Sequence, residues 1–68
     1  MAKTIAVVGN IVIDEVDGVY YARQLEQHYE NLLIEQVLPA IKKCKLPAKG
    51  WVKSAFSETF ILKSLQAI

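Results

Sequence analysis

The sequence is short of the residues that usually reinforce a small fold: it has one cysteine, two prolines and three glycines among 68 residues. The single Cys44 excludes an intrachain disulfide. Cys44 and His28 are also too few soft ligands for a structural zinc site, which takes four. A chain this short forms one domain, residues 1–68, and such a domain hides only about 60% of its unfolded surface. We therefore expect additional burial to come from self-association or from docking on a partner.

Long apolar runs are also absent, although 53% of the residues are hydrophobic. No stretch approaches the ~20 consecutive apolar residues of a membrane span, since Gly9, Asn10 and Asp14 interrupt the longest runs. The amino-terminal residues lack the pattern of a signal peptide, and a lone cysteine suits a reducing compartment. These features predict a cytoplasmic protein without a membrane partner.

Motifs that carry catalysis are missing as well. His28 is the only histidine, and no nucleophile elbow surrounds any serine. The acidic residues Asp14, Glu15 and Asp17 cluster at one turn, but a hard-cation site needs more oxygen ligands at defined spacing. We interpret the cluster as a solvated turn and predict a non-catalytic protein without a cofactor or a metal.

The first third of the chain is rich in β-branched residues and carries two turn signals. Lys3–Val8 and Ile11–Val16 are strand-like runs separated by Gly9-Asn10, a two-residue signal for a type II′ hairpin turn. Asp17-Gly18 is a type I′ signal and precedes the strand-favouring Val19–Tyr21. We predict an antiparallel β-hairpin or a short three-stranded meander. Two alternatives stay open: a single long strand with a bulge at Gly9, and a helix that starts after an Asp17 N-cap.

Beyond these runs the apolar spacing changes from two to three or four, which indicates an amphipathic helix. The residues on this spacing are Ala22, Leu25, Tyr29, Leu32, Leu33, Val37 and Ile41. Pro39 is expected to end or kink the helix, because proline lacks the backbone donor. Lys45–Gly50 is predicted to be a loop, and a second amphipathic helix is predicted from Trp51. The fold class is therefore α+β, with two helices after the hairpin or meander.

The stretch KTIAVVGNIVIDEV resembles the amino-terminal strands of ribokinase-like sugar kinases. That resemblance implies that Asp14 would touch a sugar. The family's catalytic aspartate and glycine-rich anion hole lie far downstream of this strand in those enzymes, and nothing in these 68 residues matches them. Tight turns explain the same letters, because Gly9 and Gly18 supply the positive φ that such turns require.

Charge is divided unevenly along the chain. Residues 1–41 hold six acidic and two basic residues, a net charge of −4, whereas residues 42–68 hold six lysines and one glutamate, a net charge of +5. The segment KKCKLPAKGWVK contains the candidate partner- or nucleic-acid-binding residues, which are Lys42, Lys43, Lys45, Lys49, Trp51 and Lys53. Lysines can contact phosphates and a tryptophan can stack on a base. The competing interpretation is a solvated loop whose lysines face the acidic helix of the same chain or of its twin, with Trp51 in the core.

Taken together, these features predict a small regulatory or scaffolding module that binds another protein and also associates with itself. The alternative is a nucleic-acid-binding module that uses the lysine segment. A ribbon–helix–helix repressor has the same order of elements, but its reading strand should be basic and polar. Here Lys3 is the only basic residue in the first two strand-like runs, so we keep that fold as a minor alternative.

Overall fold

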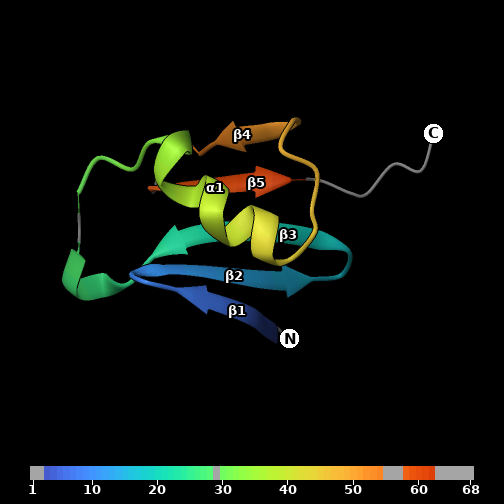
Figure 1. Ribbon diagram of the computed structural model, residues 1–68, viewed down its shortest axis with the longest axis horizontal. Coiled ribbons are helices and arrows are strands. Elements are labelled where there is room, and N and C mark those ends of the chain that lie inside the picture. The colour runs from blue at the N-terminus through green and yellow to red at the C-terminus, as the bar shows by residue number, and fades with distance from the viewer. Residues whose placement is uncertain (1–2, 29, 55–57, 63–68) are drawn as a thin grey trace.

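The computed structural model describes residues 3–28, 30–54 and 58–62. Within this part of the chain, an antiparallel sheet of five strands packs against one α-helix (Figure 1). The elements, in chain order, are β1 (Lys3–Val8), β2 (Ile11–Val16), β3 (Val19–Gln24), the 3-10 turn η1 (Glu26–His28), α1 (Ile34–Lys43), β4 (Trp51–Lys53) and β5 (Thr59–Leu62). No described helix is long and apolar enough to cross a membrane.

The meander is confirmed, and its turns have the geometry that the sequence indicates. Gly9 has a φ of +61°, and a type II′ turn requires a positive φ at the first of its two central residues. Asp17 and Gly18 have φ of +50° and +80°, both positive as in a type I′ turn. Val8 pairs with Ile11 and Val16 with Val19, so each loop has two residues. Val19–Tyr21 is therefore the start of a third strand, and a bulge at Ile5 interrupts the register of β1.

The predicted second helix is wrong, because Trp51–Lys53 and Thr59–Leu62 form strands. The sheet order is β1-β2-β3-β5-β4, so β5 inserts between the meander and β4. In β5, Phe60 and Leu62 are buried while Thr59 and Ile61 are half-buried. This alternation with a period of two is the burial pattern of a strand with one face on the core. The predicted residues 55–57 and 63–68 of that helix lie outside the described residues.

The predicted first helix is also wrong over most of its length. Ala22 and Gln24 belong to β3, and the helix begins only at Ile34. The backbone N–H of Leu33 donates to Gln36 Oε1 at 2.7 Å, which satisfies one donor at the helix start. Pro39 lies inside α1 and does not end it, because the helix continues to Lys43. Because proline has no N–H, the carbonyl of Glu35 lacks its helical donor. Glu35 is exposed, so water can bond to this carbonyl instead.

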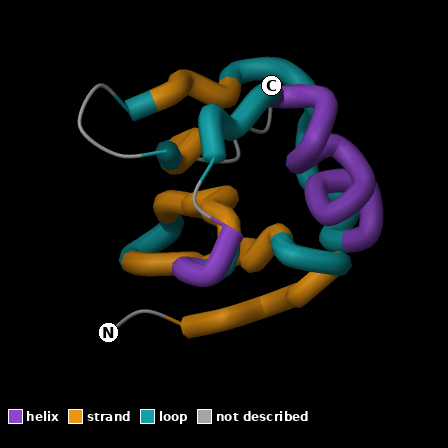
Figure 2. Tube along the Cα trace, turned by 90° about the vertical axis from the view of Figure 1, so that its left-hand side faces the viewer, coloured by secondary structure: helices purple, strands orange, loops and turns teal. Residues whose placement is uncertain are grey.

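The core lies between α1 and one face of the sheet, as Figure 2 shows with the helix on one side of the strands. The buried cluster consists of Ile11, Ile13, Ala22, Leu32, Val37, Ala40, Ile41 and Phe60. Leu32 is fully buried although it precedes the helix. Leu32, which the sequence predicts to be helical, is therefore a loop residue whose side chain packs into the core. The structure is an α+β fold with one helix over a five-stranded sheet. It has only one α-helix among the described residues, so it does not fit a ribbon–helix–helix repressor.

Candidate interaction surfaces

The lysine segment is divided by the fold into two parts. Lys42 and Lys43 occupy the last turn of α1, and Lys45 and Lys49 lie in the loop that leads to β4. All four side chains are exposed. None of these four lysines lies within 4 Å of a described carboxylate. The basic residues that form ion pairs among the described residues are Arg23 and Lys53. The four lysines form what we call the basic end: Lys42, Lys43, Lys45 and Lys49.

Trp51 and Lys53 do not belong to the basic end, although the sequence groups them with it. The indole Nε1 of Trp51 donates to the carbonyl of Pro47 at 2.7 Å, and its half-buried ring packs against the core. Lys53 Nζ donates to Asn31 Oδ1 at 2.7 Å and lies 3.2 Å from Glu58 Oε1. Both side chains therefore anchor the fold: Trp51 fixes the loop before β4, and Lys53 ties β4 to the segment before α1.

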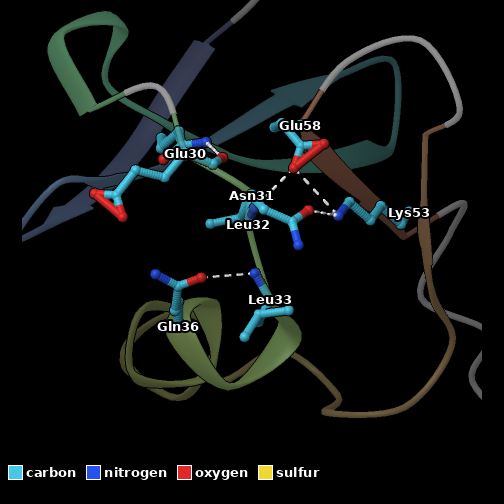
Figure 3. A network of polar contacts seen from close by, with 8 residues as sticks. Glu30, Asn31, Leu32, Leu33, Gln36, Lys53 and Glu58 are labelled. Carbon is cyan, nitrogen blue, oxygen red and sulfur yellow. Dashed lines mark hydrogen bonds and ion pairs between the residues drawn. The ribbon is translucent and has the colours of Figure 1, made fainter.

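Glu58 is the centre of this second anchor, as Figure 3 shows. Its Oε1 accepts the backbone N–H of Leu32 at 2.7 Å and faces Lys53. The Leu32 hydrogen bond, and then the Lys53 hydrogen bond, lower the pKa of the Glu58 carboxyl. Gln24 extends the network by donating from its side-chain amide to the carbonyl of Glu30. The loop between β3 and α1 is therefore held by polar contacts with strands on both sides of it.

The sheet face opposite α1 is a second candidate surface, which we call the open face. The strand register places Val7, Val12, Arg23 and Thr59 in one row, and Thr4, Asp14, Tyr21, Ile61 and Val52 in the next. Val7 is 52% exposed and Val52 is 66% exposed. No described helix lies on this face (Figure 2). The open face thus offers β-branched side chains, a tyrosine and an arginine, and the last two are enriched among residues that dominate protein interfaces.

An ion pair occupies the middle of the open face. Asp14 Oδ2 accepts from Arg23 Nε at 2.6 Å, and Asp14 Oδ1 accepts from the hydroxyl of Thr4 at 2.9 Å. The Asp14 side chain is 11% exposed, whereas that of Arg23 is 40% exposed. Arg23 uses one of its five N–H donors on Asp14. The charge of Asp14 is therefore neutralised within the sheet, and the face carries no net charge from this pair.

The two edges of the sheet differ in how well they are protected. β4 is three residues long and is flanked by Lys49 and ends with Lys53, which are features that discourage pairing. β1 is six residues long, contains no proline and has Lys3 as its only charge. The pair next to a two-residue turn exchanges both ladder hydrogen bonds, and the next pair does not. Val7 belongs to that next pair, so its N–H and C=O point away from β2. They point to the outer edge of β1, where no described strand pairs with it and which we call the free edge.

The side chains that could ligate a metal ion are dispersed over the described part of the chain. No group of three or more His, Cys, Asp or Glu side chains comes together there. Cys44 caps the end of α1 and is partly buried, and burial raises the pKa of its thiol although Lys43 lowers it. A raised pKa keeps a thiol protonated and a poor nucleophile at neutral pH.

Three comparisons, with protein-family models, with curated proteins and with solved structures, find no match to this chain. Any functional argument therefore rests on the chain's own surfaces and their chemistry.

Sequence reasoning grouped the four lysines of the basic end with Trp51 and Lys53, and it indicated the edge of the hairpin as a surface for self-association, but it missed the open face. The signals for the open face are present in the sequence. Asp14 and Arg23 both interrupt otherwise apolar or strand-favouring runs, and a two-residue turn fixes them on the same face. The sequence favours a solvated turn for Asp14 and the polar face of a helix for Arg23. Both interpretations are wrong, because Arg23 is in β3 and Asp14 is buried.

Proposed function

We propose that the protein is a small non-catalytic regulatory or scaffolding module that binds proteins and forms a homo-oligomer through the edge of β1. The free edge of β1 carries this proposal. A long edge strand with apolar side chains and few charges is a template for pairing with another strand, and proteins that stay monomeric usually block such edges. The contrast with the short, lysine-flanked β4 makes β1 the edge that is available.

A second copy of the chain is the partner that fits this edge best. Two β1 strands that pair antiparallel across a two-fold axis use the same surface on both subunits, which is the commonest form of self-association. A pair centred near Ala6 and Val7 places the two Lys3 side chains at opposite ends of the contact, so the like charges do not meet. The result would be one continuous sheet of ten strands.

The same pairing would set two open faces side by side, which gives a protein partner a wider surface with Tyr21 and Arg23 on each half. Binding of such a partner is the regulatory or scaffolding role that we propose. The lone Cys44 supports a reducing, cytoplasmic setting for the module.

Analytical ultracentrifugation at high micromolar concentration tests the proposal. We expect the wild-type chain to sediment as a dimer or a larger species, above the 7.6 kDa of one chain. Val7→Pro removes the N–H that points to the free edge without removing a donor from the β1–β2 ladder, and we expect it to be monomeric. Val7→Thr has a similar volume, is also β-branched and keeps the N–H, so it should associate like the wild type.

Each variant is checked for folding by far-UV circular dichroism and by the fluorescence of Trp51. A wild-type chain that sediments as a single 7.6 kDa species contradicts the proposal. Val7→Pro that folds and still associates as the wild type does would show that the contact is not the β1 edge. Loss of association in Val7→Thr alone would move the contact from the edge to the open face.

A further inference from the structure

We propose that the basic end, formed by Lys42, Lys43, Lys45 and Lys49, binds the phosphodiester backbone of duplex nucleic acid and does not read bases. This surface is separate from the β1 edge, and the inference does not depend on self-association. It rests on which lysines form no ion pair with a described carboxylate and on the contacts of Trp51.

The first observation is that the four lysines have no acidic partner among the described residues. The sequence suggests that they face an acidic helix of the same chain, but of the three acids in that predicted helix only Glu35 lies in α1, in its first turn, whereas Lys42 and Lys43 lie in its last turn. Glu26 lies in η1 and Glu30 in the loop that follows it, at the opposite end of the molecule from the carboxyl end of α1 (Figure 1). The positive charge of the basic end is therefore not compensated by the acids that the sequence seemed to provide.

The second observation concerns the acids that are at the same end. The turn between β2 and β3 lies at that end of the molecule (Figure 1) and holds Asp17, and Glu15 is near the end of β2 just before it. Glu15 accepts the backbone N–H of Gly18 at 3.2 Å, which ties its carboxylate to its own turn. These charges weaken the attraction for a polyanion without abolishing it, so binding should be of the low-salt, non-specific kind.

The third observation is that the Trp51 side chain already makes contacts within the fold. Its indole N–H is bonded to Pro47 and its ring packs against the core, so it is not available to stack on a base. The structure also places no arginine at the basic end, and arginine is the side chain that reads guanine most often. Lysines alone recognise phosphate charge, which is denser on a duplex than on a single strand. Binding should therefore favour duplex over single strands and be indifferent to sequence.

Fluorescence anisotropy with a labelled mixed-sequence DNA duplex, titrated at several salt concentrations, tests the inference. Four contacts predict a slope of about −3.6 for log affinity against log salt, which is roughly a 150-fold loss between 50 and 200 mM salt. Lys43→Gln combined with Lys45→Gln should reduce the slope to about −1.8 and the loss to roughly 12-fold. Lys53→Gln is the matched control, because Lys53 is bonded to Asn31 and Glu58, and it should leave the slope unchanged.

Two further measurements separate the alternatives. Trp51 fluorescence should not be quenched by the duplex, and a single-stranded oligonucleotide of the same length should bind more weakly. No binding at low salt overturns the inference. So does a slope that Lys53→Gln reduces as much as the double variant does. Quenching of Trp51 with preference for single strands would replace backbone binding by base stacking, and equal affinity for anionic vesicles would show a general polyanion surface without a nucleic-acid preference.

Discussion

Asp14 is the position where a single substitution should test the structure of the open face most directly. It accepts two side-chain hydrogen bonds, from Thr4 at 2.9 Å and from Arg23 at 2.6 Å. Asp14→Ala removes both and leaves a hydroxyl and a guanidinium without their partner. A hydrogen bond to a charged group contributes about 1.5–3 kcal/mol, but Arg23 is 40% exposed and water replaces part of what it loses. We expect Asp14→Ala to lower the free energy of unfolding by about 2–3 kcal/mol.

A double-mutant cycle isolates the ion pair from the rest of this loss. Asp14→Asn keeps an oxygen for the Thr4 hydroxyl while it removes the charge, so it should cost about 1–2 kcal/mol. Combining Asp14→Ala with Arg23→Ala should give a coupling energy of about 1 kcal/mol, between the values for exposed and for buried pairs. The assay is urea unfolding followed by Trp51 fluorescence, with the protein concentration held constant because self-association would also add stability. A coupling energy below about 0.3 kcal/mol would refute the pairing.

Two further predictions concern the turns and the Glu58 contacts. Gly18→Val should cost about 1 kcal/mol in urea unfolding, since φ is +80° while a Cβ would meet no atom within 4 Å; an unchanged midpoint would mean that the type I′ turn is absent. Gly9→Val should behave in the same way at φ +61°. The pKa of Glu58 is lowered in the folded chain, first by the hydrogen bond from the Leu32 N–H and then by Lys53. The ionised carboxylate therefore stabilises the fold fully above its ordinary pKa of 4.5. This contribution is lost as the pH falls through the lower pKa that Glu58 has in the folded chain. Glu58→Gln should therefore lose less stability than the wild type between about pH 5 and pH 3, and equal losses would contradict the contact.

The meander was predictable because its signals are local. Gly9-Asn10 and Asp17-Gly18 each demand positive φ at defined positions, and the runs between them contain strand formers in lengths that match the pairing. Turn chemistry then fixes the register. Once the register is set, the row that contains Asp14 and Tyr21 follows without further information.

The helical interpretation failed because one apolar spacing runs through a strand, a loop and a helix. The positions from Ala22 to Ile41 fit a helical stripe, yet Ala22 ends up in a strand, Leu32 in a loop and Ile41 in α1. All three are buried in one core. Apolar spacing indicates which residues are buried. It distinguishes a helix from a strand only where the periodic pattern runs without interruption through one element. The Gln24 amide contact with Glu30 and the Glu58 contact with Leu32 hold the intervening loop, and neither is visible as periodicity.

The prediction of a helix from Trp51 failed for a related reason. The strands found there also explain why Trp51 and Lys53 are not part of the basic end. Trp51–Lys53 and Thr59–Leu62 are too short for periodicity to distinguish a strand from a buried helical turn. Their conformation depends on strand pairing: β5 pairs with β3, whose residues lie about forty positions earlier in the chain, and β4 pairs with β5. That pairing turns Trp51 toward the core and brings Lys53 within reach of Glu58. A helix from Trp51 would have kept both side chains beside the other lysines. Because β5 pairs with the edge of β3 instead, Trp51 packs against the core and is separated from the exposed Lys42, Lys43, Lys45 and Lys49. The phosphate contacts that we propose for these lysines therefore do not include base stacking on Trp51.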